Sequence, residues 1–180
     1  MLTMLRLFIL PFLVIAILDR HWKTGFALMM IAGITDGLDG LLARLLHQHT
    51  KLGQYLDPIA DKLLLSTLFV VLTHVGMIPQ YVTVLVFSRD VGILLISTLL
   101  FMTNALRDFR PSLFGKLNTC VQIFAVVGVM ANRVLPIPHL TVIDYNLLRL
   151  IAVLAPLSAA QYAWIVIRRV STPIEPVVAP

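Results

Sequence analysis

Long apolar segments follow one another along almost the whole chain, and only short polar stretches separate them. A helix that crosses a membrane needs about 20 mostly apolar residues, so 180 residues leave room for about six spans with short connections. The mean hydropathy of +0.93 and the hydrophobic share of 59% lie outside the range of soluble domains. The sequence therefore predicts an all-α integral membrane protein with six transmembrane helices.

Hydropathy and helix-breaking residues set the bounds of these helices. We expect them over about residues 4–18, 24–46, 54–75, 80–102, 115–133 and 145–168. The proline-rich segment 171–180 is predicted to be a disordered tail, which leaves residues 1–170 as a single transmembrane domain. The only cysteine, Cys120, lies in an apolar stretch and is expected to be a small buried packing residue.

Lysine and arginine are unevenly divided between the two ends of the predicted helices. One end has Arg6, Arg44, Lys51, Arg107, Arg110, Lys116, Arg168 and Arg169, and the other has Arg20, Lys23, Arg133 and Arg149. The richer side normally faces the cytoplasm, so both termini and the connection between the second and third helices are predicted to be cytoplasmic. This rule and anionic lipid head groups explain the net charge of +5, so nucleic-acid binding is not predicted.

Four aspartates interrupt the apolar pattern where the second predicted helix ends and the third begins. They are Asp36, Asp39, Asp57 and Asp61. Each would cost about 2.5–3.5 kcal/mol at the centre of a lipid-facing helix, so they require a protein interior, a cavity or bound cations. Helical residues three or four apart share a face, so the first two aspartates form one stripe and the last two another. The pattern predicts an active site at the cytoplasmic ends of these two helices.

Four carboxylates brought close together in a partly dry site cannot all stay ionised unless cations neutralise them. Ligation by oxygen alone suits Mg²⁺ or Mn²⁺ and not zinc, which prefers histidine or cysteine. Two such ions would form a clamp for a diphosphate. A carboxylate that is not saturated by metal would then be free to act as general base toward an acceptor hydroxyl.

Small residues lie in register with the aspartates, at Gly40, Ala43 and Gly53. Because they lack bulk, they let a large ligand approach the helix backbone. Close helix packing is the alternative role of such residues in membranes, and it is our interpretation of Gly33 and Gly37. Intramembrane aspartates also occur as relays in cation- or proton-coupled transporters, which is the rival function. A purely structural membrane subunit explains neither the spacing nor the small residues.

The aspartates, the small residues and one arginine together form a longer motif, D-x2-D-G-x2-A-R-x8-G-x3-D-x3-D, made by Asp36, Asp39, Gly40, Ala43, Arg44, Gly53, Asp57 and Asp61. In this motif, and in its six-span layout, the chain resembles the CDP-alcohol phosphatidyltransferase family. The resemblance implies that Asp36, Asp39 and Asp57 bind two divalent ions, Mg²⁺ or Mn²⁺. It implies that Asp61 joins the second ion and serves as the general base.

The same resemblance implies that a CDP-linked lipid, CDP-diacylglycerol, binds at the motif. Its cytidine diphosphate would lie over Gly40, Ala43 and Gly53, with Arg44 beside them. Thr3 and Arg6 resemble the N-terminal segment of members that make glycerophospholipids and are assigned to the same ligand. An acceptor hydroxyl would attack the lipid-side phosphorus and release CMP. The family resemblance also suggests a homodimer. The protein is expected in a bacterial-type or mitochondrial-type membrane, and a bacterial inner membrane is favoured.

Three further segments, residues 52–62, 88–91 and 111–119, resemble the cardiolipin synthases that use CDP-diacylglycerol. The Ala-Arg-Glu and Leu-Arg-Glu segments usual in the related phosphatidylglycerophosphate synthases are absent from the sequence. The resemblance therefore favours phosphatidylglycerol as the acceptor, with glycerol 3-phosphate as the alternative.

Either acceptor carries phosphate and needs cationic side chains. The candidates are Arg89, Lys116, Arg107 and Arg110. The alternative for Arg89 is a structural ion pair with an aspartate of another helix, because the adjacent Asp90 is expected to point elsewhere around the helix. The alternative for the other three is a charge that only sets orientation near lipid phosphates. Lys62 is expected either to contact a phosphate or to extend along the surface toward water.

Overall fold

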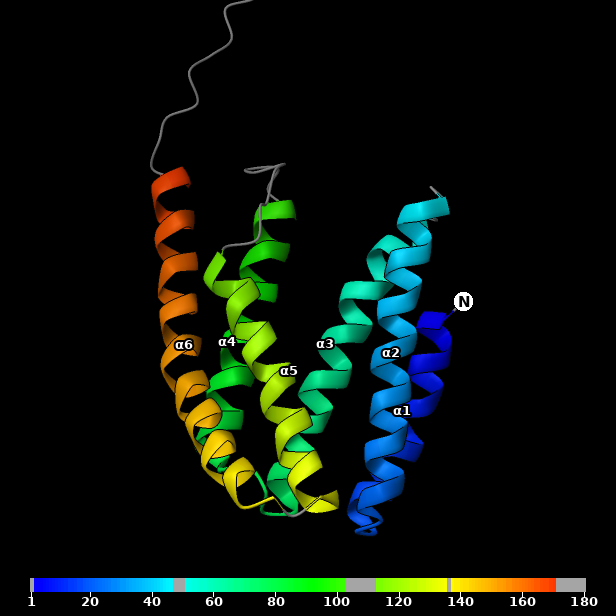
Figure 1. The fold of residues 1–180 in the computed structure, drawn as a ribbon. Coiled ribbons are helices and arrows are strands. Elements are labelled where there is room, and N and C mark those ends of the chain that lie inside the picture. Colours follow the sequence, from blue (N-terminus) through cyan, green and yellow to red (C-terminus); the bar gives the residue numbers. More distant parts are fainter. Residues whose placement is uncertain (1, 47–50, 103–112, 136, 171–180) are drawn as a thin grey trace, which may run out of the picture.

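A computed structural model of the chain shows six helices joined in sequence (Figure 1). They are α1 (Leu2–Leu18), α2 (Trp22–Leu46), α3 (Lys51–His74), α4 (Gln80–Met102), α5 (Leu113–Val134) and α6 (Pro138–Val170). The structure describes residues 2–46, 51–102, 113–135 and 137–170, and it describes side chains over residues 5–35, 62–96, 114–135, 137, 139–164 and 167. The predicted all-helical architecture is confirmed over these residues. The predicted tail lies outside them.

The predicted and observed helix bounds differ most at α6. The other five helices begin and end within three residues of the expected bounds, whereas α6 begins at Pro138, seven residues before the expected residue 145. Proline suits the first position of a helix because its missing N–H needs no partner there. Asp144, within the added turns, has a carboxylate that accepts a hydrogen bond of 3.2 Å from Asn132 of α5. Gly128 of α5 leaves it space, because a Cβ there would collide with it.

Two helix ends have the same cap. After α1 and after α3, a pair of hydrogen bonds of 2.8 and 3.0 Å closes the last turn in the pattern of a Schellman motif. Each cap contains one residue with a positive φ, which is Arg20 after α1, with φ 60°, and Gly76 after α3, with φ 78°. Glycine adopts this conformation without strain, whereas arginine does not. The two caps turn the chain back for α2 and α4.

The helices run alternately up and down, so their connections gather at two ends (Figure 1). Residues 19–21, 75–79 and 135–137 lie at one end. The start of α1, the end of α2, the start of α3 and the end of α6 lie at the other. Lys23 and Arg133 lie at the first end, as the predicted division of basic residues requires. The Arg133 guanidinium carbon there lies 6.0 Å from the centre of the Trp22 ring. Arg149 departs from the prediction, because α6 begins at Pro138 and Arg149 lies eleven residues along it.

The core is formed by aliphatic side chains from all of the helices. α1 packs against α2 and α3, α6 packs against α4 and α5, and contacts of α2 and α3 with α5 and of α3 with α4 join the two groups. The largest fully buried hydrophobic side chains are Leu13, Ile17, Leu68, Phe69, Leu72, Val82, Val86, Val126, Met130 and Ile151. Within the described part, these contacts leave few polar groups inside.

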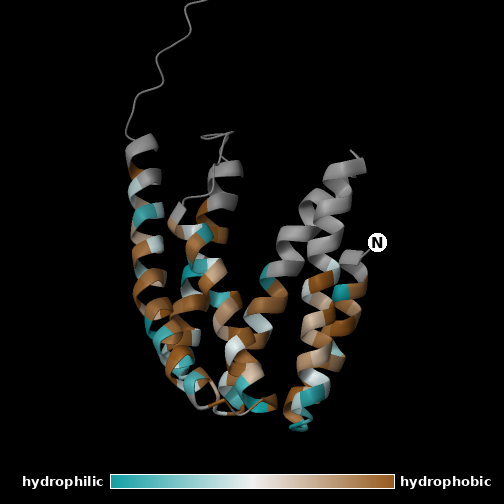
Figure 2. Ribbon diagram, in the orientation of Figure 1, coloured by the Kyte–Doolittle hydropathy of each residue, from teal (hydrophilic) through white to brown (hydrophobic). Residues whose placement is uncertain are grey.

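Hydrophobic residues predominate along the helices (Figure 2), and many of the large ones are exposed. Large side chains such as Phe8, Phe87, Phe124 and Leu157 are at least half exposed, and a continuous apolar exterior is typical of proteins that contact lipid. Among the described residues, two segments, Phe114–Val134 and His139–Trp164, are long and apolar enough to cross a membrane. The prediction that Cys120 is buried is wrong, because it lies exposed on this outer face.

Candidate active site

The aspartate motif lies on two adjoining helix ends. Asp36 and Asp39 belong to the last three turns of α2, and Asp57 and Asp61 belong to the first three turns of α3. Both helices are continuous through the motif, so residues three or four apart remain on one face. Only residues 47–50 separate the helices, and the two ends lie at the same end of the bundle (Figure 1).

Side chains of the motif lie outside the described part of the structure, and only their helical backbone is placed. This applies to the four aspartates and to Gly40, Ala43, Arg44 and Gly53. The predicted roles of these residues therefore stay predictions. What the structure establishes is that the motif lies on two consecutive helices, α2 and α3.

A cavity of about 360 Å³ lies next to the motif, between α1, α2, α3 and α5. Gly33 and Ile34 of α2 and Leu64 of α3 line it, so it begins about one helical turn from Asp36 and Asp61. Most of the other lining side chains are aliphatic or methionine. Its size is at the lower end of the range for small-molecule sites. It can accommodate an apolar part of a ligand whose polar part lies at the motif.

Arg6 brings a positive charge to this cavity. Its side chain is only 5% exposed and lines the cavity from α1. Because its side chain lies in the wall of a largely apolar cavity, Arg6 is placed to contact a ligand there. Thr3 lies one turn earlier on α1, and its side chain is outside the described part. The structure thus places the predicted N-terminal contacts beside the second and third helices.

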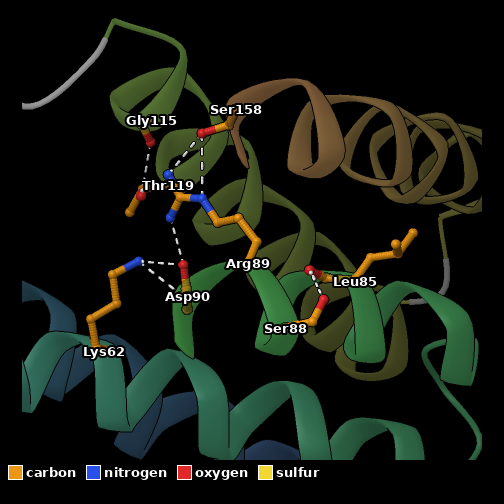
Figure 3. A network of polar contacts seen from close by, with 8 residues as sticks. All are labelled: Lys62, Leu85, Ser88, Arg89, Asp90, Gly115, Thr119 and Ser158. Atoms are coloured by element: carbon orange, nitrogen blue, oxygen red, sulfur yellow. Dashed lines mark hydrogen bonds and ion pairs between the residues drawn. The ribbon is translucent and has the colours of Figure 1, made fainter. Parts of the chain in front are cut away.

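A polar network joins α3, α4 and α6 near the middle of α3 and α4 (Figure 3). The Lys62 Nζ donates to both carboxylate oxygens of Asp90, at 3.0 Å each. The Arg89 Nη1 donates to the same carboxylate at 2.5 Å, and its Nε and Nη2 donate to the Ser158 hydroxyl at 3.3 and 3.0 Å. One carboxylate thus holds two cations, and within this network one positive charge is in excess.

The expectation that Asp90 points away from Arg89 is wrong. Adjacent helical residues project about 100° apart, but the long arginine side chain bends back far enough to reach its neighbour. Among the side chains that the structure describes, the aspartate partner of Arg89 is on α4 itself and not, as the alternative predicts, on another helix. Lys62 makes the cross-helix pair instead.

Arg89 retains hydrogen-bonding capacity despite these contacts. Its hydrogen bonds to Asp90 and Ser158 use three of the five N–H groups that a guanidinium offers. The side chain is buried, with 7% exposed, whereas that of Lys62 is 31% exposed. Lys116 is exposed in the first turns of α5, and Arg107 and Arg110 lie outside the described residues. The structure therefore brings Arg89 and Lys62 together and leaves Lys116 at the surface.

Sequence reasoning missed three polar residues of the interior. The Ser158 hydroxyl accepts a hydrogen bond from the Arg89 guanidinium, and Asn118 and Gln122 of α5 are completely buried. Asn118 and Gln122 carried a detectable signal, because two amides four residues apart in an apolar helix share a face. Ser158 carried none, since serine is common in membrane helices for packing.

Comparison with known proteins identifies the motif. The sequence profile described as CDP-alcohol phosphatidyltransferase matches residues 1–167, which is nearly the whole chain. The chain belongs to this family. CDP-alcohol phosphatidyltransferases are membrane-associated transferases that generally depend on divalent metal ions, and the predicted family is confirmed.

Several curated relatives of this family are similar over much of the chain. The human cardiolipin synthase (CMP-forming) is 33% identical over 152 residues, covering 74% of this chain and 50% of its own length. A probable phosphatidylglycerophosphate synthase of Mycobacterium tuberculosis is 36% identical over 132 residues, covering 69% and 61%. The CDP-diacylglycerol–glycerol-3-phosphate 3-phosphatidyltransferase of Bacillus subtilis is 32% identical over 109 residues, covering 61% and 55%. The chain thus spans about half the length of the curated relatives it matches.

The donor set of the motif fits the metal dependence of the family. Four carboxylates and no sulfur or imidazole ligand favour a hard divalent cation. Among the side chains that the structure describes, no three of histidine, cysteine, aspartate or glutamate come together as ligands. Asp36, Asp39, Asp57 and Asp61 are therefore the residues of the motif that fit such ions.

Proposed function

We propose that this protein transfers a phosphatidyl group from CDP-diacylglycerol to the hydroxyl of a glycerol-type acceptor and releases CMP. One observation carries the proposal. The complete family motif lies on two adjoining helix ends, directly beside an apolar cavity with a buried arginine. A water-soluble diphosphate at the motif and a lipid portion in the cavity would suit this combination of charge and apolar surface.

Asp36, Asp39 and Asp57 would hold two divalent ions, Mg²⁺ or Mn²⁺, and Asp61 would share the second. Bound there, the ions would neutralise the diphosphate and stabilise the leaving phosphate oxygen. Asp61 would accept the proton of the acceptor hydroxyl as its oxygen forms a bond to the lipid-side phosphorus and the bond to CMP breaks.

The remaining motif residues would bind the donor lipid. Gly40, Ala43 and Gly53 would let the cytidine diphosphate approach the backbone, with Arg44 contacting its phosphates. Arg6, with Thr3 one turn away, would contact the lipid from α1, and the burial of Arg6 in the cavity wall supports its share of this role. The aliphatic lining would then contain the start of the acyl chains.

Phosphatidylglycerol is the proposed acceptor, which would make the protein a cardiolipin synthase. The similarity to cardiolipin synthases over 74% of the chain supports this choice. Glycerol 3-phosphate is the alternative, supported by the similarity to the M. tuberculosis and B. subtilis proteins. Arg89, Lys116, Arg107 and Arg110 would bind the acceptor phosphate. The positive charge in excess at Lys62 and Arg89 supports an anion site there.

The six helices would all cross the membrane, as one domain over residues 1–170. Both termini and the active site would face the cytoplasm of a bacterial cell, where water-soluble CMP can leave. The charge distribution supports this orientation. The protein would act as a homodimer, as proposed from the family resemblance.

An acceptor panel tests the proposed function. Purified protein is mixed with CDP-diacylglycerol and phosphatidylglycerol, glycerol 3-phosphate, inositol phosphate or serine, and product lipids are identified by mass. We expect CMP release and cardiolipin with phosphatidylglycerol, and none after chelation of divalent ions. Phosphatidylglycerophosphate as the main product would establish the alternative acceptor. Ion flux in liposomes without transfer to any acceptor would instead support a transporter.

A further inference from the structure

Two amides on α5 lack partners inside the protein. Asn118 and Gln122 are both 0% exposed. Within the described part of the chain, neither the amide nitrogen nor the amide oxygen of either residue has a hydrogen-bond partner. They lie one helical turn apart, so the four unpaired atoms share one face of α5.

This face of α5 is directed to the interior of the bundle. Gly128 marks the side that faces α6, because a Cβ there would meet a carboxylate of that helix. Ile123 marks the side that lines the cavity. At 100° per residue, Asn118 and Gln122 lie on the buried arc between these two sides. Contacts between α3 and α5 place α3 on the inner side of α5.

The two amides are also close in depth to the proposed reaction centre. Thr119, next to Asn118, lines the cavity together with Leu64 of α3, which is three residues from Asp61. The hydrogen bond from Asn132 to Thr141 sets the antiparallel register of α5 and α6 and brings Ser158 to the level of the first turn of α5. Asn118 is therefore about one turn deeper than Ser158.

Unpaired amides at this depth are expensive, because a buried polar group without a partner loses its hydration and gains nothing in return. A structural role would require partners on neighbouring helices, as Asn132 of the same helix has in Thr141 and Asp144. Asn118 and Gln122 have none among the described residues. Their amide groups are therefore free to form hydrogen bonds with a ligand or with buried water.

An amide matches one kind of ligand group best. It offers two N–H donors and one oxygen acceptor. The amide oxygen would therefore repel an anion, and the amide NH₂ group would repel a cation. A neutral hydroxyl both donates and accepts a hydrogen bond, so it can pair with the amide oxygen and with the amide NH₂ group. We propose that Asn118 and Gln122 bind the glycerol hydroxyls of the acceptor and determine specificity for a polyol, an inference that rests on the proposed function. The phosphate of the same acceptor lies toward Lys62 and Arg89.

The test replaces each amide by an apolar side chain of similar size, in Asn118→Leu and Gln122→Met. Each change removes about one hydrogen-bonded group, so we expect the KM for phosphatidylglycerol to rise about tenfold while the KM for CDP-diacylglycerol is unchanged. In the absence of acceptor the melting temperature should stay equal or rise, because an unpaired amide is lost. Asn132→Leu is the matched control, since it breaks paired bonds and should lower the melting temperature without changing the acceptor KM.

A second acceptor tests the contribution of the secondary hydroxyl by itself. Phosphatidyl-1,3-propanediol keeps the primary hydroxyl and the phosphate of phosphatidylglycerol but lacks the secondary hydroxyl. The wild-type protein should discriminate against it about tenfold, and the two variants should discriminate much less. The same comparison between glycerol 3-phosphate and 1,3-propanediol phosphate applies if the water-soluble acceptor is the true one.

The outcomes separate the two proposals. If the wild-type protein releases no CMP from CDP-diacylglycerol with any acceptor, the proposed function is wrong. If the wild-type protein is active but both variants keep its acceptor KM and its discrimination, the amides do not bind the acceptor. A higher melting temperature with unchanged kinetics would assign them to buried water only and would overturn the inference.

Discussion

At the scale of single residues, Asp90 is the carboxylate that pairs with both Lys62 and Arg89. It is 5% exposed and is the only carboxylate that the described network offers to Lys62 and Arg89. Removing one partner of a buried ion pair is far more costly than the pair is worth, because the remaining charge is left without compensation. Arg89 is the residue that would be left, since Lys62 reaches the surface.

Asp90→Asn should therefore destabilise the protein by about 3 kcal/mol or more. The expected result is a clear fall in the melting temperature in detergent, measured by loss of the monodisperse peak after heating. Asp19→Asn is the control, because Asp19 is exposed in the connection after α1. A melting temperature equal to that of the wild type would show that the network adds nothing to stability.

Asp61 is the residue on which turnover should depend most. Asp61→Asn keeps the size of the side chain but removes the proposed proton acceptor, so the turnover number should fall by at least about 100-fold. Binding of CDP-diacylglycerol, measured by thermal stabilisation, should be largely retained. Full turnover in this variant would exclude Asp61 as the base, whereas loss of both turnover and binding would assign it to the metal site alone.

At the scale of elements, the ends of α1 and α3 provide a natural comparison. Both helices end in the same cap, but Arg20 and Gly76 differ in how easily they adopt a positive φ. A side chain in the left-handed region costs roughly 1 kcal/mol relative to glycine. The backbone is therefore more strained at Arg20 than at Gly76, although the two caps have the same geometry.

Exchanging the residue types should move stability in opposite directions. Gly76→Ala should lower the stability by about 1 kcal/mol, and Arg20→Gly should raise it by a similar or smaller amount. Thermal denaturation in detergent measures both. Gly92→Ala is the control for glycine replacement, because a Cβ there meets nothing within 4 Å on α4 and should be neutral or stabilising. A fall with Arg20→Gly would show that its side chain has a stabilising contact.

At the scale of the whole molecule, the alternating helices divide the chain into two ends. The connections 19–21, 75–79 and 135–137 share one end, and the aspartate motif belongs to the other. The uneven distribution of lysine and arginine predicts that the motif end is cytoplasmic. This orientation decides which compartment supplies the nucleotide-linked lipid and receives CMP.

Cysteine labelling in whole cells tests the orientation. In a Cys120→Ser background, a membrane-impermeant thiol reagent should label Met77→Cys, which lies in the connection after α3. It should label His49→Cys only after the membrane is opened. The reverse pattern would contradict the cytoplasmic site, and labelling of both in intact cells would argue against a membrane-spanning bundle.

The sequence alone determined most of what is local in this protein. Apolar length and helix-breaking residues fixed five helices to within three residues, because a helix in an apolar setting depends mainly on its own residues. The spacing of the aspartates identified the family, since a metal and diphosphate site needs particular residues at particular intervals. α6 was the exception, and its added first turns include Asp144, whose carboxylate accepts a hydrogen bond from Asn132 and lies against Gly128 of another helix.

Only the tertiary structure decided which polar groups meet inside the bundle. That Arg89 pairs with Asp90 and Ser158, that Lys62 joins them from α3, and that Asn118 and Gln122 lack partners cannot be read from spacing along one helix. These contacts depend on the rotation and register of whole helices, which are set by the summed packing of many aliphatic side chains. The sequence therefore predicted the chemistry of the motif, and the packing determined the pocket around it.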